Sequence, residues 1–186
     1  MKKLLAAAAA LVLLTGACTS SDEKSTWEEY TEWRNTNNAW LAQQQQRTNP
    51  DGTPYFKTVI PPWNTGSFVL MHYFNNRAET EGNLSPIYTS TVDVRYYVHL
   101  YDDTPVDSSV NATGAGKSGI YRSMLNNLIP GWAVALSDMR CGDTAEVVIP
   151  YQLAYGEQSM GAMYPYSNLR FNIRLVDVYK YEATPY

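Results

Sequence analysis

The sequence predicts an α+β domain in which several antiparallel strands surround one short helix. From Tyr55 onward, apolar residues recur with a period of two, which is typical of strands that bury one face. One convincing helix interrupts these strands, and the regular alternation of strands and helices that indicates a parallel sheet does not appear. The length of 186 residues suits one such domain with a small addition, which we expect to be an extra N-terminal helix.

The composition argues against several classes of protein. A hydrophobic content of 45% is too high for a disordered chain. The 14 Lys and Arg residues are outnumbered by 18 Asp and Glu and form no basic cluster, so we expect no nucleic-acid partner. Two His and two Cys are too few for a disulfide-stapled scaffold or a Cys/His zinc site, and we expect neither a metal nor another cofactor.

The first residues have the order of a secretory signal. A basic start, Met1–Lys3, precedes an apolar run over 4–14 that is too short to span a bilayer. The small residues before Cys18 resemble the end of a bacterial lipoprotein signal. We therefore predict a signal peptide over 1–17, lipidation of Cys18, a tether over 18–25, and a membrane anchor in the cell envelope. The outer membrane is the expected membrane, with the protein facing the periplasm or the surface. The alternative is a plain signal peptide with a chance Cys.

Residues 26–50 predict a helical segment that precedes a domain over 51–186. Thr26 is in place to cap a helix over 26–46, and Glu29 has the spacing of a capping box. The turn residues from Asn49 to Gly52 end the pattern. We expect one aromatic face to pack on the domain, with packing on a partner as the alternative. The residues of this face are Trp27, Tyr30, Trp33, Trp40 and Leu41.

The remaining pattern predicts strands around one short helix. The strands cover Tyr55–Ile60, Phe68–Phe74, Val92–Tyr101, Ala145–Ile149 and Leu169–Leu175. In the third strand, Asp93 falls on the face opposite Val92 and Val94. The helix begins near Pro130, carries an apolar stripe from Trp132 to Met139, and is expected to end by Gly142.

Three other features favour ordinary structural roles. With Cys18 lipidated, Cys141 has no disulfide partner and is expected to be a small buried side chain. Residues 114–118 resemble part of a phosphate-binding loop, but the pattern needs Gly where Asn111 stands, so a loop between strands is expected. His72 and His99 alone make a poor metal site.

Several motifs follow one another over about 92–178. Leu128–Trp132 resembles V-I-P-G-W, and Val148–Pro150 with Ala154–Glu157 resembles V-I-P followed by A-Y-G-E. Pro165–Phe171 resembles P-x-S/A-T-L-x-F, and the upstream match to V-x-Y…L-x-D-G-x-x-F-D-S-S runs from Val94 to Ser109. Together they resemble FKBP-type peptidyl-prolyl cis-trans isomerases, because several motifs in one order are more specific than any one of them.

The resemblance implies a curved antiparallel sheet wrapped around the short helix, with an apolar pocket between them. Trp132 would form the pocket floor, and the backbone N–H of Ile129 would hold the substrate carbonyl. Asp107 would be hydrogen-bonded at the edge. The other implied wall residues are Tyr96, Tyr155 and Phe171, and the residues expected to contact substrate around them are Val106, Tyr121, Leu128, Met163 and Tyr164.

The resemblance implies that the substrates are proline-containing polypeptides. Turning an Xaa–Pro bond breaks amide conjugation, with a barrier of about 18–20 kcal/mol. The twisted amide has less charge separation than the planar one, so a dry aromatic pocket disfavours the planar form more. One alternative is a peptide-binding or chaperone lipoprotein with little or no catalysis, and another is an interaction lipoprotein that uses the fold only as scaffold.

Departures from the family pattern lie around the rim of the expected pocket. They predict reduced isomerase activity and weaker binding of macrolide inhibitors than is typical of the family. The loop over 158–164 is one residue short. The replacements are Val106 and Gly119 for two Phe, Met163 for Ile, Tyr164 for Pro, and Asp103 for a turn Gly.

Overall fold

The structure is a computed structural model that describes residues 24–179. The predicted signal peptide over 1–17 and the predicted lipidation at Cys18 lie outside these residues. Within the described part of the chain, no helix combines the length and apolar character needed to cross a bilayer.

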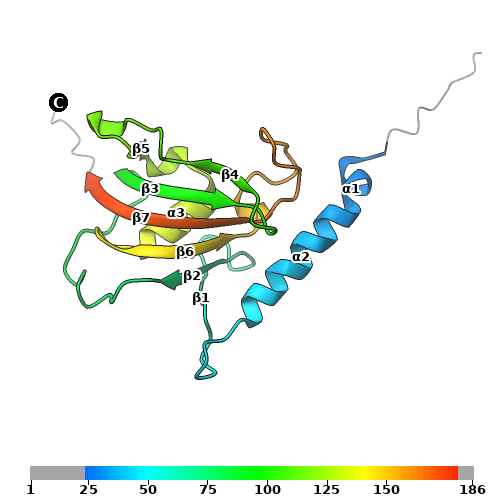
Figure 1. The fold of residues 1–186 in the computed structure, drawn as a ribbon, viewed down its shortest axis with the longest axis horizontal. Helices are drawn as coiled ribbons and strands as arrows, with labels where there is room; N and C mark the ends of the chain where they lie inside the picture. Colours follow the sequence, from blue (N-terminus) through cyan, green and yellow to red (C-terminus); the bar gives the residue numbers. More distant parts are fainter. Residues whose placement is uncertain (1–23, 180–186) are drawn as a thin grey trace, which may run out of the picture.

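One antiparallel sheet of seven strands forms the body of the molecule (Figure 1). The strand order is β1-β2-β6-β7-β3-β4, and β5 also pairs with β3. The strands are β1 (Lys57–Val59), β2 (Val69–Tyr73), β3 (Thr91–His99), β4 (Pro105–Ser108), β5 (Tyr121–Met124), β6 (Thr144–Ile149) and β7 (Leu169–Tyr179). The long strands β3 and β7 pair along nearly their full length at the centre of the sheet.

The short helix α3 (Pro130–Asp138) packs against one face of this curved sheet, behind the strands in Figure 1. Residues 131–136 are all buried, so the helix is enclosed by the core rather than laid on its surface. Pro130 occupies the first turn as expected, but the helix ends at Asp138, and Gly142 lies in the turn that follows. The prediction of an α+β fold with an antiparallel sheet around one short helix is confirmed.

Two strands are absent from the sequence-based prediction. Strand β4 pairs with the end of β3, and β5 pairs with its beginning, so both lie along the edge of β3 that faces away from β7. Each has four residues, and β4 begins with Pro105, which an edge strand tolerates. Such short edge strands carry too little alternation to stand out in the sequence.

The predicted alternation within β3 is wrong at Asp93. Val92, Asp93 and Val94 are all buried, and the pairing of β3 with β7 shifts register between Asp93 and Val94. The side chain of Arg122 compensates the buried carboxylate of Asp93 with two hydrogen bonds of 2.6 and 2.7 Å. A buried carboxylate is tolerated where such a bidentate pair satisfies it.

The N-terminal helix forms as α1 (Thr26–Glu29) and α2 (Thr31–Gln46), which Tyr30 separates. The cap is Ser25 rather than Thr26. The Ser25 hydroxyl accepts from the N–H of Glu28 at 3.3 Å, and the Glu28 carboxylate accepts from the N–H of Ser25 at 3.1 Å. The capping box is therefore present one residue before its expected position.

The expected aromatic face of this helix packs on the domain only in part. Trp33 packs against the main core and Trp40 against a small cluster on the sheet, whereas Trp27 is half exposed. The buried residues of α2 are the polar Arg34 and Asn37. The pattern of hydrophobicity did not predict that polar side chains form the centre of this contact.

Candidate active site

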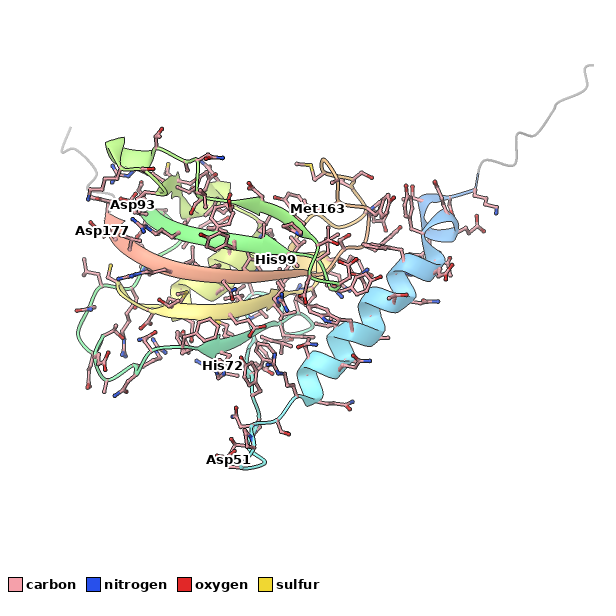
Figure 2. The ribbon with its side chains drawn as sticks, in the orientation of Figure 1. Asp51, His72, Asp93, His99, Met163 and Asp177 are labelled. Carbon is pink, nitrogen blue, oxygen red and sulfur yellow. The ribbon has the colours of Figure 1, made fainter. Side chains whose placement is uncertain are left out.

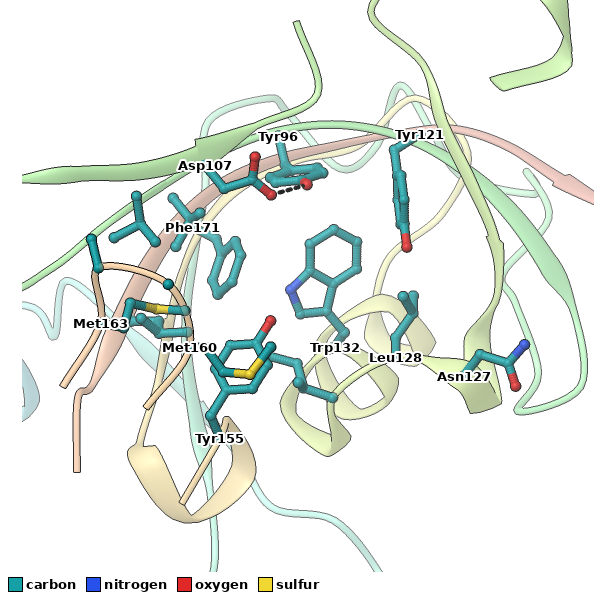
Figure 3. Close-up of a pocket in the computed structure, with 16 residues that line it drawn as sticks. Tyr96, Asp107, Tyr121, Asn127, Leu128, Trp132, Tyr155, Met160, Met163 and Phe171 are labelled. Carbon is teal, nitrogen blue, oxygen red and sulfur yellow. Dashed lines mark hydrogen bonds between the residues drawn. The ribbon is translucent and has the colours of Figure 1, made fainter. Parts of the chain in front are cut away.

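A cavity of about 510 Å³ lies between α3, the sheet and the loop after η3 (Tyr151–Leu153), as Figure 3 shows. The sequence-predicted residues that line it come from four strands, the start of α3 and the loop. They are Tyr96, Val106, Asp107, Tyr121, Leu128, Ile129, Trp132, Tyr155, Met163 and Phe171. Residues far apart in the sequence therefore meet in one apolar pocket.

Trp132 lies at the base of this pocket, in the first turn of α3, and is 4% exposed. Its ring meets Tyr96 edge-on at 5.2 Å and Phe171 edge-on at 5.4 Å between ring centroids. Such edge-to-face contacts hold the three rings in fixed orientations. The indole thus presents a rigid apolar surface to anything that enters.

Tyr96 and Asp107 form a hydrogen-bonded pair at the pocket edge. They meet because β4 pairs with β3 beside Tyr96. The hydroxyl of Tyr96 donates to Asp107 Oδ2 at 2.6 Å (Figure 3). The N–H of Ser108 donates to Asp107 Oδ1 at 2.7 Å. Burial, and then the hydrogen bond to Asp107, raise the pKa of Tyr96, so its hydroxyl remains a donor at neutral pH.

Ile129 precedes α3 in an extended conformation, with φ −57° and ψ 146°. Its carbonyl accepts the N–H of Trp132 at 2.9 Å and so begins the helix. Within residues 24–179, its own N–H donates to no backbone or side-chain acceptor. This amide is therefore available as a donor in the pocket wall.

The residues of the pocket rim were predicted less well than those of the floor. Tyr121 stands edge-on to Tyr96, at 5.8 Å between centroids, and lines the pocket, whereas Gly119, which stands where the family pattern has a Phe, does not. The structure adds lining residues that the sequence analysis did not single out as site residues, although Val98 and Leu169 lie within the quoted motifs. The added residues are Val98, Asn127, Met160, Gly161, Ala162 and Leu169.

Tyr164 does not line the pocket, which corrects its predicted place. It is 52% exposed, and its ring contacts Trp33 of α2 at 5.1 Å and Tyr30 at 5.6 Å. The loop turns between Met163, which is buried, and Tyr164, so consecutive side chains point to opposite sides.

The chemistry that these residues allow is binding and orientation. Asp107 is the one carboxylate of the lining, which contains no Lys, Arg, His or Cys. Burial, together with the charge of Asp107, raises the pKa of Tyr155, so this hydroxyl also stays protonated. Among residues 24–179, no group of three or more His, Cys, Asp or Glu is arranged to hold a metal ion. The pocket suits an apolar group next to a carbonyl acceptor.

The curved sheet, the short helix and the aromatic pocket define the class of fold, and the comparisons with known proteins identify the family. The sequence model of FKBP-type peptidyl-prolyl cis-trans isomerases matches residues 83–176. This chain belongs to that family.

Curated relatives match about half of the chain. The macrophage infectivity potentiator of Trypanosoma cruzi is 38% identical over 106 residues, which are 56% of this chain and 52% of the relative. The FKBP-type 22 kDa peptidyl-prolyl cis-trans isomerase of Escherichia coli is 39% identical over 94 residues, which are 50% of this chain and 43% of the relative. The chain spans about half the length of the curated relatives it matches, or less.

Solved structures confirm the FKBP-like fold. The peptidyl-prolyl cis-trans isomerase of Pseudomonas syringae has a TM-score of 0.64 at 23% identity, and the match covers 81% of this chain and 96% of that chain. FkpA from Escherichia coli has a TM-score of 0.61 at 22% identity, with 81% and 62% covered. At these identities the likeness concerns the fold alone.

Proposed function

We propose that this chain is a peptidyl-prolyl cis-trans isomerase that acts on proline-containing polypeptides. The observation that carries the proposal is the juxtaposition of the Trp132 floor, the Tyr96–Asp107 pair and the Ile129 N–H, which has no acceptor in the described part of the chain. The family and the curated relatives that bear this activity in their names support it.

The mechanism needs only positioning and removal of water. The proline ring packs on Trp132, between Tyr155 and Phe171, while the Ile129 N–H donates to a substrate carbonyl outside the rotating amide and so fixes the orientation of the peptide. The planar amide has more charge separation than the twisted amide. Transfer of the Xaa–Pro amide from water into the pocket therefore raises the energy of the planar form more than that of the twisted form. The hydrogen bond between Tyr96 and Asp107 fixes the orientation of both side chains at the pocket edge, where the apolar surface ends.

The altered rim predicts a weaker form of this activity. Val106 lines the pocket where the family pattern has a larger Phe, and Met160 and Met163 also line it. A missing ring removes apolar contact worth roughly 1–3 kcal/mol to a ligand. Reduced turnover and weaker macrolide binding follow. The same rim favours the second candidate function, a peptide-binding protein with little catalysis.

Location in the cell envelope belongs to the same proposal. The signal-like sequence before Cys18 supports it, and so does a relative from Legionella longbeachae named outer membrane protein MIP, 40% identical over 93 residues. Mass spectrometry of protein extracted from membranes tests the anchor. We expect cleavage before Cys18 with added acyl mass, and an unmodified N-terminus elsewhere contradicts it.

A protease-coupled assay on a series of Xaa–Pro peptides, with the full chain, tests the activity. We expect catalysis proportional to protein concentration, with kcat/KM below values typical of the family. Binding of the same peptides is measured in parallel. Binding without catalysis replaces the isomerase with the peptide-binding protein, and the absence of both contradicts the assignment of the pocket.

A further inference from the structure

The loop that forms one wall of the pocket touches α2 on its other side. We call residues 156–168 the rim loop. Figure 1 shows it in orange beside α2, and Figure 2 places Met163 on the side of the molecule where α2 lies. Met160 and Met163 face the cavity, whereas Tyr164 faces the helix.

Backbone hydrogen bonds between its own residues close the rim loop. The N–H of Tyr166 donates to the carbonyl of Gly156 at 2.8 Å across its base. Met160 and Met163 exchange two backbone hydrogen bonds of 3.1 and 3.0 Å at its tip. These bonds fix the shape of the loop but not its distance from α3, which depends on what the loop rests against.

Trp33 is one of the aromatic residues of the N-terminal helices that the outer side of the loop rests against. Its indole N–H donates to Ser167 Oγ at 3.1 Å, and the Ser167 hydroxyl donates to the carbonyl of Tyr164 at 2.7 Å. The indole ring also meets the ring of Tyr164 nearly at a right angle, 5.1 Å between centroids. A second edge-on contact, to Tyr101 at 5.2 Å, joins it to the turn after β3. Trp33 therefore bridges the rim loop and the sheet.

A buried pair of asparagines fixes the helix in register with the loop. Asn37 lies one turn after Trp33, and both Asn37 and Asn168 are fully buried. The N–H of Asn168 donates to Asn37 Oδ1 at 2.9 Å, and its side-chain amide donates to the Asn37 carbonyl at 2.7 Å. A shift of α2 by one residue would leave these buried amides unpaired, which is costly. The helix thus holds Trp33 at one defined place.

We propose that Trp33 is a positioning residue for the pocket, through which α2 holds the Met160–Met163 wall against the bound peptide. This inference rests on the proposed isomerase function and deepens it, because it assigns part of the substrate affinity to a helix outside the residues that the family model matches. Trp33 touches neither the substrate nor the reacting bond, so it acts on affinity rather than on the turnover step.

The test compares Trp33→Ala with the wild-type full chain. We expect KM for an Xaa–Pro peptide to rise roughly 3- to 10-fold while kcat stays within about twofold, since the floor and the Ile129 amide are unchanged. Hydrogen–deuterium exchange, which needs no substrate, should show faster exchange at the amides of Met163 and Tyr166. Trp33→Phe keeps a ring and should recover part of the affinity.

Trp40→Ala is the matched control on the same helix. Trp40 packs against the cluster of Phe56, Leu70 and Val148, away from the rim loop, so both KM and rim-loop exchange should remain as in the wild type. Equal changes in both variants, or a Trp33→Ala variant with unchanged KM and exchange, overturn the inference. Failure of the wild type to isomerise contradicts the proposed function instead, and the exchange measurement still tests whether Trp33 holds the loop.

Discussion

Trp132 serves the hydrophobic core and the pocket with one side chain. It is almost fully buried, yet one surface of its ring lines the cavity beside Tyr96 and Phe171. Trp132→Ala should therefore lower the free energy of unfolding by about 3–5 kcal/mol and also lower kcat/KM. Urea unfolding and the isomerase assay check the two effects. A stable but inactive variant would show that the ring contributes little to the core.

A substitution of Asp107 should affect activity more than the free energy of unfolding, because its carboxylate is exposed at the pocket edge. Asp107→Ala should lower kcat/KM by about tenfold or more while the free energy of unfolding falls by less than about 1 kcal/mol. Asp102→Ala is the matched control, since Asp102 is also exposed and also accepts a backbone N–H, from Thr104 at 3.1 Å. Full activity of Asp107→Ala would remove Asp107 from the mechanism.

Most individual site residues could be predicted from the sequence, because motif order and spacing fix their places in the fold. Asp103, which stands where the family pattern has Gly, adopts φ 67°, a left-handed conformation that Asp tolerates. Tyr164 could not be predicted, because the direction of a loop side chain depends on what lies outside the loop. Here that neighbour is Trp33, which is distant in the sequence.

At the scale of elements, α3 and β6 meet at Gly131. A Cβ atom built there would lie 2.3 Å from Ile149 Cγ2 and 2.9 Å from its Cδ1. Gly131→Ala should therefore push the helix away from the strand and destabilise the fold by about 1–3 kcal/mol. In urea unfolding, the double variant with Ile149→Ala should lose less than the sum of the single losses. Strict additivity would contradict this close approach.

The elements with long, clean alternation were predictable, whereas two of the short strands were not. Strands β3 and β7 pair over nine positions of β3. Strands of this length are long enough to show a clear period of two in the sequence. Strands β4 and β5 are four residues each and have their positions from pairing with β3 rather than from their own sequence. Packing of α2 on the domain was expected, but the centre of the contact was not predicted, since its buried residues are polar.

At the scale of the whole molecule, a buried carboxylate ties the turn before β6 to the segment after β2. Asp143 accepts from Thr80 Oγ1 at 2.6 Å, from the Arg140 N–H at 2.8 Å and from Asn75 Nδ2 at 3.0 Å. Burial by itself raises the pKa of Asp143, but these hydrogen bonds and the nearby Arg77 outweigh it and lower the pKa below its ordinary value of 3.8.

Because the folded pKa of Asp143 is depressed, its contribution to stability is present above the ordinary value and is lost as the pH falls through the folded pKa. Thr80→Val removes one of the bonds and should destabilise the fold by about 1–3 kcal/mol at neutral pH. The difference from the wild type should shrink as the pH falls below the ordinary value of 3.8 and through the folded pKa of Asp143. Urea unfolding at several pH values checks this, and a difference independent of pH would contradict it.

The central claim is that the Trp132 pocket holds an Xaa–Pro bond and accelerates its rotation. Two-dimensional NMR exchange on an Ala–Pro peptide, with a catalytic amount of the full chain, measures that rotation directly. We predict cis–trans exchange that rises in proportion to protein concentration, together with a shift of the Ile129 amide signal when peptide is in excess. Exchange at the uncatalysed rate, while the Ile129 amide still shifts, would contradict the claim and leave the pocket as a binding site.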